Sequence, residues 1–506
     1  MTSFFVIAGL LVGQNLFAKT YGGTNTDWGH SIIQTQDGGF AVAGWTMSFG
    51  AGNYDFLVLK LSSTGTIQWA RTLGGPDDDL ACSIIQTSDG GLAVAGWTGI
   101  YASGPTDFVV LKLSSAGALL WTRIFGGASR DEAWDIIQTQ DGGFAVAGMT
   151  ESFGAGSADF LVLKLTSTGT LSWARTYGGT GYDRTESMIQ TIDGGYAVAG
   201  MTASYGAGSY DFLVLKLNPD GSQAWARTFG GAGEDQAYSI VQTADTGFAV
   251  AGYADISGVG NYEFTVLKLN STGNMQWTRL FGGANDDRTH SIINTQGGGL
   301  AVAGYTNTFG AGSYDFLVLK LFSTGTREWA RTYGGTGYDR PESMIQTQDG
   351  GFAVMGATAS YGAGSYDFLV LKVDANGNYP GCVLSCSTVD TSVFPIITFP
   401  SMGATCLPDT ASVTPTVTSP SLTVTNACTP VDVEEADLAP RPGITCSFIP
   451  GGALFSSPDQ INIKIYAVDG RLACSGELQK GENRIYLDRG VYLWVAGQYR
   501  GKAVVR

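Results

Sequence analysis

The sequence predicts an all-β fold in which seven copies of one four-stranded unit close into a ring. A Trp recurs every 52 residues from Trp69 to Trp329, and Phe17 occupies the same phase one step earlier. No insertion or deletion separates the copies, so the seven units have equal length. With 44% hydrophobic and only 14% charged residues, the 506-residue chain can form a large core and is not expected to be disordered as a whole.

Each unit contains four segments with strand character. In the first unit these are HSIIQT at 30–35, FAVAGWT at 40–46, DFLVLKL at 55–61 and TIQWART at 66–72. The first pair is joined by QDGG and the second by SSTG, both of which are tight-turn sequences. A longer Gly-rich loop, MSFGAGNY, connects the two pairs. No unit has a sustained helical period, so antiparallel strands are predicted throughout.

The two ends of the array predict closure. After Gly377 the seventh copy reads NYPGC in place of a fourth strand, whereas QNLFAKT at Gln14–Thr20 supplies that phase alone. A strand from the N-terminus would therefore complete the last unit. Radial repetition protects strand edges, and a linear array needs no such join. We expect a monomeric seven-bladed β-propeller over residues 14–380, closed by the N-terminal strand.

The repeated string YGG...D...SIIQT.DGG..VAG.T resembles a seven-bladed β-propeller repeat family found in exported bacterial and archaeal proteins, over roughly residues 14–378. The resemblance implies the fold and says little about activity, because propellers host unrelated functions.

Charged residues recur at fixed phases. The acids of these series make twenty of the 44 acids, and the bases fourteen of the 28. A group needed in every blade is expected to hold that blade together, by capping turn amides or by pairing a carboxylate with a strand Lys or Arg. The series are Asp27, Asp79, Asp131, Asp183, Asp235, Asp287 and Asp339; Asp37, Asp89, Asp141, Asp193, Asp245 and Asp349, with Gly297 as the exception; Asp55, Asp107, Asp159, Asp211, Glu263, Asp315 and Asp367; Lys60, Lys112, Lys164, Lys216, Lys268, Lys320 and Lys372; and Lys19, Arg71, Arg123, Arg175, Arg227, Arg279 and Arg331.

Strand order places the long loops on one face of the ring, together with the Asp27 and Asp55 series. Varying residues on that face are the better functional candidates, and rings beside carboxylates suit sugars or a protein partner. The candidate ligand-binding residues are Tyr54, Tyr210, Tyr262, Tyr314 and Tyr366, with Asp27, Asp79, Asp131, Asp183, Asp235, Asp287 and Asp339. The tyrosines could equally fill gaps between blades. For the phase Trp45, Trp97, Met149, Met201, Tyr253, Tyr305 and Ala357, which ends a strand, gap filling is the preferred interpretation.

Catalysis finds little support. His30 and His290 share one phase, where other copies carry Cys82, Trp134, Glu186, Tyr238 and Glu342, and such a varied position is expected to be solvated surface. Two histidines lack the third ligand of a catalytic zinc site. Each loop offers one acid, so calcium finds no clustered ligands. We expect no catalytic residue, no metal and no cofactor.

Three further segments are predicted. FFVIAGLLV at Phe4–Val12 is too short to span a bilayer and indicates a signal-peptide-like segment over 1–13, cleaved near Gly13. Residues 381–457 form a Thr/Ser/Pro-rich spacer. Residues 458–506 read INIKIYAVDGRL, GENRIYL and GVYLWVAGQYRGKAVVR, an alternation that predicts a small β sandwich. These strings resemble the type IX secretion (Por) sorting domain, and the resemblance implies contact with export machinery. Cys82 is expected to be a buried thiol. The six cysteines outside the ring are disulfide candidates: Cys382, Cys386, Cys406, Cys428, Cys446 and Cys474.

The predicted function follows from these observations. The net charge of −16 disfavours nucleic acid and anionic membranes and favours neutral or cationic partners. We expect an extracellular or outer-surface, non-enzymatic propeller that binds a glycan or a protein on its long-loop face and has no membrane span in the mature chain. A hydrolase or lyase acting on polysaccharide and a structural surface-layer protein are the alternatives.

Overall fold

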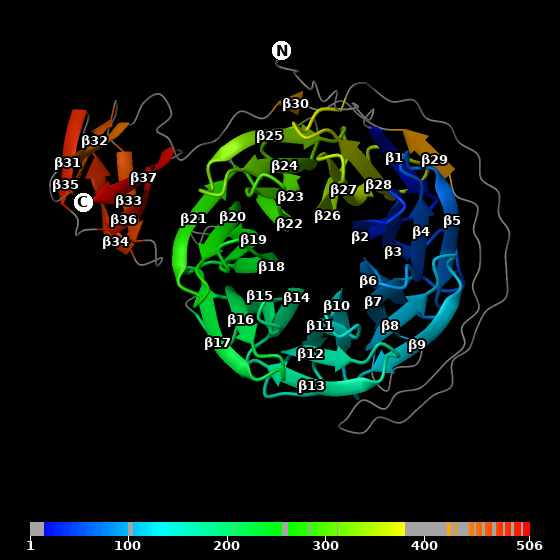
Figure 1. The fold of residues 1–506 in the computed structure, drawn as a ribbon. Coiled ribbons are helices and arrows are strands. Elements are labelled where there is room, and N and C mark those ends of the chain that lie inside the picture. Colours follow the sequence, from blue (N-terminus) through cyan, green and yellow to red (C-terminus); the bar gives the residue numbers. More distant parts are fainter. Residues whose placement is uncertain are drawn as a thin grey trace, which may run out of the picture.

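The computed structural model describes residues 15–99, 105–206, 208–255, 262–282, 285–310 and 312–379, together with strands between 423 and 505. Seven sheets surround a common axis (Figure 1); five of them have four strands, and two have a fifth strand added at the outer edge. The predicted seven-bladed β-propeller is confirmed. In the described part of the chain no helix is long and apolar enough to cross a bilayer.

Every blade has the same antiparallel meander, running from the axis outward (Figure 1). The innermost strands are β2 Asp27–Gln34, β6 Asp79–Gln86, β10 Asp131–Gln138, β14 Asp183–Gln190, β18 Asp235–Gln242, β22 Asp287–Asn294 and β26 Asp339–Gln346. The second strands are β3 Phe40–Thr46, β7 Leu92–Thr98, β11 Phe144–Thr150, β15 Tyr196–Thr202, β19 Phe248–Ala254, β23 Leu300–Thr306 and β27 Phe352–Thr358. The third strands are β4 Asp55–Leu61, β8 Asp107–Leu113, β12 Asp159–Leu165, β16 Asp211–Leu217, β20 Glu263–Leu269, β24 Asp315–Leu321 and β28 Asp367–Val373. The outermost strands are β5 Ile67–Leu73, β9 Leu119–Phe125, β13 Leu171–Tyr177, β17 Gln223–Phe229, β21 Met275–Phe281, β25 Arg327–Tyr333 and β1 Phe17–Gly22. We number the blades 1 to 7 by their innermost strands, from β2 to β26.

Blade 7 is closed by the N-terminal strand. β1 pairs antiparallel with β28, with Phe17 opposite Lys372 and Tyr21 opposite Phe368. The Tyr21 hydroxyl donates to the carbonyl of Gly65 in blade 1 at 2.6 Å, which joins the closing strand to the next blade. The two chain ends of the ring are thus held together by hydrogen bonds, as the missing fourth strand predicted.

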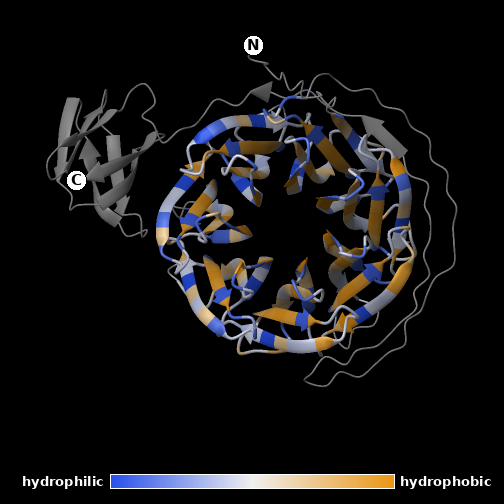
Figure 2. Ribbon diagram, viewed as in Figure 1, coloured by the Kyte–Doolittle hydropathy of each residue, from blue (hydrophilic) through white to orange (hydrophobic). Residues whose placement is uncertain are grey.

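The core lies within and between the blades. Second and third strands are largely hydrophobic (Figure 2), and almost all of their residues are buried. Side chains from adjacent blades interdigitate: Ala41 and Val58 of blade 1 pack with Ile84 and Val109 of blade 2. Burial of both sheet faces explains why these strands read as nearly continuous apolar runs.

Nine further strands follow the ring: β29 Thr423–Asn426, β30 Val431–Asp432, β31 Thr445–Ile449, β32 Gly452–Ser457, β33 Ile461–Ala467, β34 Leu472–Leu478, β35 Gly481–Tyr486, β36 Gly490–Ala496 and β37 Tyr499–Val505. The predicted signal segment, the spacer, the sorting-type sandwich and the six disulfide candidates fall largely or wholly outside the residues described. They remain predictions.

Candidate functional site

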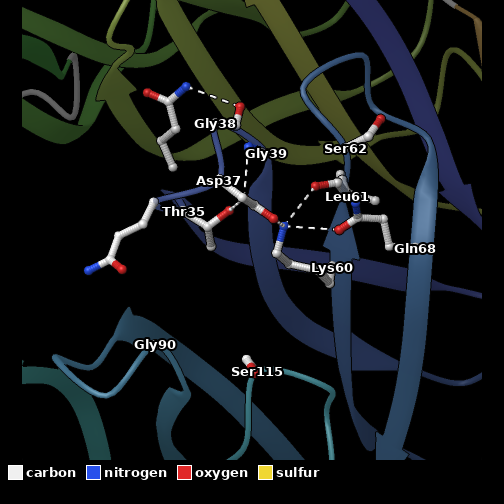
Figure 3. A network of polar contacts seen from close by, with 12 residues as sticks. Thr35, Asp37, Gly38, Gly39, Lys60, Leu61, Ser62, Gln68, Gly90 and Ser115 are labelled. Atoms are coloured by element: carbon white, nitrogen blue, oxygen red, sulfur yellow. Dashed lines mark hydrogen bonds and ion pairs between the residues drawn. The ribbon is translucent and has the colours of Figure 1, made fainter.

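The acids of the Asp37 series belong to their turns. Asp37 Oδ1 accepts hydrogen bonds from Thr35 Oγ1 at 2.6 Å and from the Gly39 amide at 3.0 Å, while Oδ2 lies 2.8 Å from Lys60 Nζ (Figure 3). These partners lower the pKa of Asp37 to about 2, despite some desolvation that opposes the shift. Blade 6 has Gly297 at this phase, and there Lys320 pairs with Glu328 at 2.9 Å instead. The series therefore has the structural role that repetition indicated.

The Asp27 and Asp55 series meet in pairs at the blade junctions. Each Asp27-phase acid is at most 3% exposed. At the junction of blades 4 and 5, Asp211 and Asp235 both border Gly230, where an added Cβ would clash with their carboxylates. Asp27 accepts hydrogen bonds from Thr46, from Ser48 Oγ at 2.7 Å and from the Gly23 amide at 2.7 Å.

This burial revises the prediction for seven of the candidate ligand residues. The side chains of Asp27, Asp79, Asp131, Asp183, Asp235, Asp287 and Asp339 are enclosed between blades and do not offer an exposed surface. Sequence position placed them correctly at the long-loop end, but burial is a property of how neighbouring blades pack. These aspartates are therefore structural, and we leave them out of the set of residues that could contact a ligand.

The innermost strands all carry a bulge at one position. In β2 the pairing with β3 passes from Gly29 directly to Ser31, so His30 has no partner opposite it. The same shift recurs in the other innermost strands. A bulge re-aims its side chain, and here it directs the residue toward the axis. The bulge residues are His30, Cys82, Trp134, Glu186, Tyr238, His290 and Glu342.

The bulge position is mostly enclosed, which corrects the expectation of a solvated surface. His290 and Cys82 are each 7% exposed, and Cys82 is a buried free thiol as predicted. The Glu186 and Glu342 side chains are 7% and 8% exposed. Rings from adjacent blades meet here, with the Tyr238 and His290 centroids 4.5 Å apart. A seven-fold ring brings side chains that are 52 residues apart in the chain onto one axis.

Nearly all of the non-repeated bases of the ring converge at this axis. Of the nineteen Lys and Arg residues between 14 and 380, fourteen belong to the two repeated series, and one of the other five, Arg327, lies on outer strand β25. The remaining four lie at the start of innermost strands or directly before one: Arg130, Arg184, Arg288 and Arg340. Because the other four blades carry Trp28, Leu80, Glu132 and Gln236 at the phase shared by Arg184, Arg288 and Arg340, the fold does not require Arg there.

Two of these arginines have a carboxylate from the bulge of their own strand. Arg184 Nε donates to Glu186 Oε1 at 2.7 Å, and Arg340 Nε lies 2.9 Å from Glu342 Oε1. Burial raises the pKa of Glu186 and of Glu342, while the nearby arginines oppose that shift. Both glutamates therefore remain paired within the axial cluster.

Blade 6 departs from this pattern. His290 stands at the bulge, so Arg288 has no glutamate two residues ahead. Arg288 Nη2 lies 3.6 Å from Asp286 Oδ2. The guanidinium instead lies over the rings of Tyr253 and Tyr262, 4.5 Å and 3.9 Å from their centroids. Arg288 Nε and His290 Nε2 are buried atoms without a hydrogen-bond partner.

His290 is oriented by the neighbouring blade. Its Nδ1 lies 3.3 Å from Glu342 Oε2, so the Nδ1–H form donates to that carboxylate and leaves a lone pair on Nε2. Burial, followed by the charges of Arg340 and Arg288, holds the pKa of His290 well below its usual range. The imidazole is therefore neutral near pH 7.

An aromatic arc runs along the long-loop end from blade 5 to blade 1. Neighbouring rings lie 4.5–6.3 Å apart by centroid, and the blade 5 rings join the rest through Tyr238 and His290. The arc includes four of the five predicted tyrosines, and Tyr210 lies beside it next to Tyr182. All five predicted tyrosines are half-buried. The members of the arc are Tyr253, Tyr262, Tyr305, Tyr314, Tyr338, Tyr366, Trp28, Trp45 and Tyr54.

The sequence pattern pointed to part of this site. It identified the tyrosines, but it missed the arginines, the role of the bulge and Trp28. The arginines could have been found in the sequence as the few Lys and Arg residues that belong to neither repeated series. Among the residues that the structure describes, no group of three or more His, Cys, Asp or Glu side chains could hold a metal ion.

Comparisons with known proteins agree with the fold. A family model described as "Domain of unknown function (DUF5122) beta-propeller" matches residues 193–223. A curated relative, regulatory protein FlaEY of Caulobacter vibrioides, is 26% identical over 385 residues, which cover 69% of this chain and 37% of the relative. The chain thus spans little more than a third of that relative's length.

Solved structures with a similar arrangement share little sequence. Sqt1 from Chaetomium thermophilum is 12% identical, with a TM-score of 0.43, and the match covers 73% of this chain and 86% of that one. A puromycin hydrolase is 10% identical, with a TM-score of 0.44 and coverage of 86% and 59%. The WD40 domain of Neurospora crassa Pan2 is 10% identical, with a TM-score of 0.42 and coverage of 69% and 97%.

Proposed function

We propose that this protein is a non-enzymatic binding protein that recognises a glycan on the long-loop end of its propeller. The observation that carries the proposal is the aromatic arc. Rings of this kind stack on sugar faces, and the polar groups beside them can accept and donate hydrogen bonds to hydroxyls. We further propose that the protein acts outside the cell, as the N-terminal and C-terminal sequence patterns indicate.

The propeller fold does not require a tyrosine at the phase of Tyr54. Blades 2 and 3 have Thr106 and Ala158 at the phase of Tyr54, and both blades keep the same strands and register. The backbone carbonyl at this phase bonds to the next blade whichever side chain is present: Thr106 O accepts from the Asp131 amide at 2.9 Å, and Tyr54 O from Asp79 at 2.8 Å. Selection of Tyr in the other five blades therefore has a cause other than the fold.

A glycan-array screen with the full chain, followed by calorimetric titration of the best ligand, tests this proposal. Tyr210→Ala combined with Tyr314→Ala should weaken binding by at least about tenfold, since each stacked ring contributes about 1 kcal/mol or more. Phe322→Ala is the matched control, because Phe322 is 51% exposed and lies in a short turn at the opposite end. Full binding by the double variant would contradict the proposal.

A polysaccharide-cleaving enzyme is the second candidate, favoured by one observation. The axis breaks the internal symmetry in adjacent blades: a neutral His290 oriented by Glu342 has a free Nε2 and lies close to Arg288 and Arg340. A general base next to cationic groups suits proton abstraction or water activation. Release of new chain ends from any ligand found in the screen, abolished by His290→Ala, would favour this candidate over simple binding.

A further inference from the structure

We propose that Arg288 and His290 form a recognition site for the uronic acid residue of a glycan. In this arrangement the guanidinium of Arg288 binds the sugar carboxylate, and His290 Nε2 accepts a hydrogen bond from a sugar hydroxyl. The inference rests on the proposed glycan-binding function and names the chemical class of the ligand.

The first argument comes from the internal repeat. In blades 4 and 7, an arginine and a glutamate two residues apart form an ion pair on the innermost strand. Blade 6 has the arginine without the glutamate. Arg288 Nη2 is 3.6 Å from Asp286 Oδ2, a longer separation than the 2.9 Å between Arg340 and Glu342, and Arg288 Nε, like Arg340 Nε, has no hydrogen-bond partner. Arginine presents donors in a planar fork that matches a carboxylate. A carboxylate brought by a ligand would supply the partner that the chain itself provides in the two other blades.

The second argument is the unpartnered nitrogen of His290. This residue is 7% exposed, and a buried polar atom without a partner carries a free-energy cost. Because Nδ1 faces Glu342 at 3.3 Å, Nε2 is an acceptor and requires a donor such as a hydroxyl. A carboxylate alone cannot meet this requirement, whereas a uronic acid carries both a carboxylate and hydroxyl groups.

The surroundings leave Arg288 accessible while fixing its position. Its side chain is 25% exposed and is held over Tyr253 and Tyr262. Both tyrosine hydroxyls donate to Glu234, at 2.7 Å and 3.1 Å, so that carboxylate already has partners. The net charge of the chain opposes an anionic ligand at long range, but at physiological salt this repulsion is screened beyond about 8 Å. The site thus departs from the neutral or cationic partners that the overall charge indicated.

Calorimetric titration of the full chain with oligogalacturonate and with the matching neutral galactose oligomer tests the inference. The acidic oligomer should bind ten- to a hundredfold more tightly, the range expected for a hydrogen bond to a charged group. Equal affinities would overturn the inference. Displacement of the acidic oligomer by an equal concentration of inorganic sulfate would also overturn the inference, because sulfate has no hydroxyl donor.

Two variants locate the site. His290→Glu supplies Arg288 with the carboxylate present in blades 4 and 7, and it should abolish the preference for the acidic oligomer. Arg288→Gln should do the same, and it keeps the test decisive if His290→Glu does not fold. Arg327→Gln is the control, since Arg327 lies on outer strand β25, away from the axis. A preference retained by folded Arg288→Gln would refute the site.

The Tyr210→Ala and Tyr314→Ala double variant separates this inference from the proposed function. If both oligomers bind with equal affinity and the double variant weakens both, glycan binding holds and the uronate site is wrong. If the wild-type protein binds no glycan, both fail.

Discussion

Replacing Asp235 by Asn should stabilise the propeller at pH 8 and leave it unchanged at pH 4. Asp235 is 1% exposed and faces Asp211 at the junction of blades 4 and 5. Burial, helped by the charges of Asp211 and Asp255, raises its pKa to about 7. Blade 5 has Ala254 where blade 1 has Thr46, so Asp235 lacks a hydroxyl donor that Asp27 has.

The magnitude follows from proton linkage. Between the unfolded value near 3.8 and the folded value near 7, the folded chain binds more protons than the unfolded chain. The free energy of unfolding therefore falls as pH rises through this window. A shift of about 3 pKa units corresponds to a ceiling of about 4 kcal/mol. With about 2.1 cal/mol/K per residue over roughly 360 residues, a gain of about 2 to 4 kcal/mol raises Tm by roughly 3 to 5 °C.

Thermal and urea unfolding of wild type and Asp235→Asn at pH 4, 6 and 8 would measure this difference. The gain should be absent at pH 4, partial at pH 6 and complete at pH 8. Asp37→Asn is the control of opposite sign: although desolvation raises the pKa of Asp37, Lys60, Thr35 and the Gly39 amide lower it to about 2, so the charge stabilises the fold and the variant should lose stability at pH 8. An equal gain for Asp235→Asn at pH 4 and pH 8 would refute the reasoning.

Two further predictions restore the repeat pattern where one blade departs from it. Gly297→Asp should raise the free energy of unfolding, measured in urea, by about 0.5 to 1 kcal/mol. The added side chain meets open space and can pair with Lys320 and the turn amides, as Asp37 does with Lys60. An unchanged stability would mean that Glu328 already satisfies Lys320. Thr246→Gly should gain up to about 1 kcal/mol, because Thr246 has a φ of 63° where blade 1 has Gly38 at 78°; a loss would show that the left-handed conformation is not strained there.

The sequence predicted the tyrosines of the candidate site, but neither the burial of the Asp27 series nor the bulge. The tyrosines stood out because their phase tolerates Thr and Ala in two blades. The Asp27 series shares their end of the ring, yet its burial depends on the packing of one blade against the next. The alternation of side chains along a strand does not predict the bulge. The single extra residue at the bulge changes the direction in which His30 or His290 points.

The sequence by itself determined the number of blades, the strands and the closure, because a 52-residue period and a missing fourth strand allow one economical arrangement. Only the tertiary structure decided which side chains meet. His290 lies 52 residues from both Tyr238 and Glu342 in the chain, and it contacts both because the ring curves adjacent blades around one axis. Contacts between blades are set by that curvature, which leaves no mark on the periodicity of any single strand.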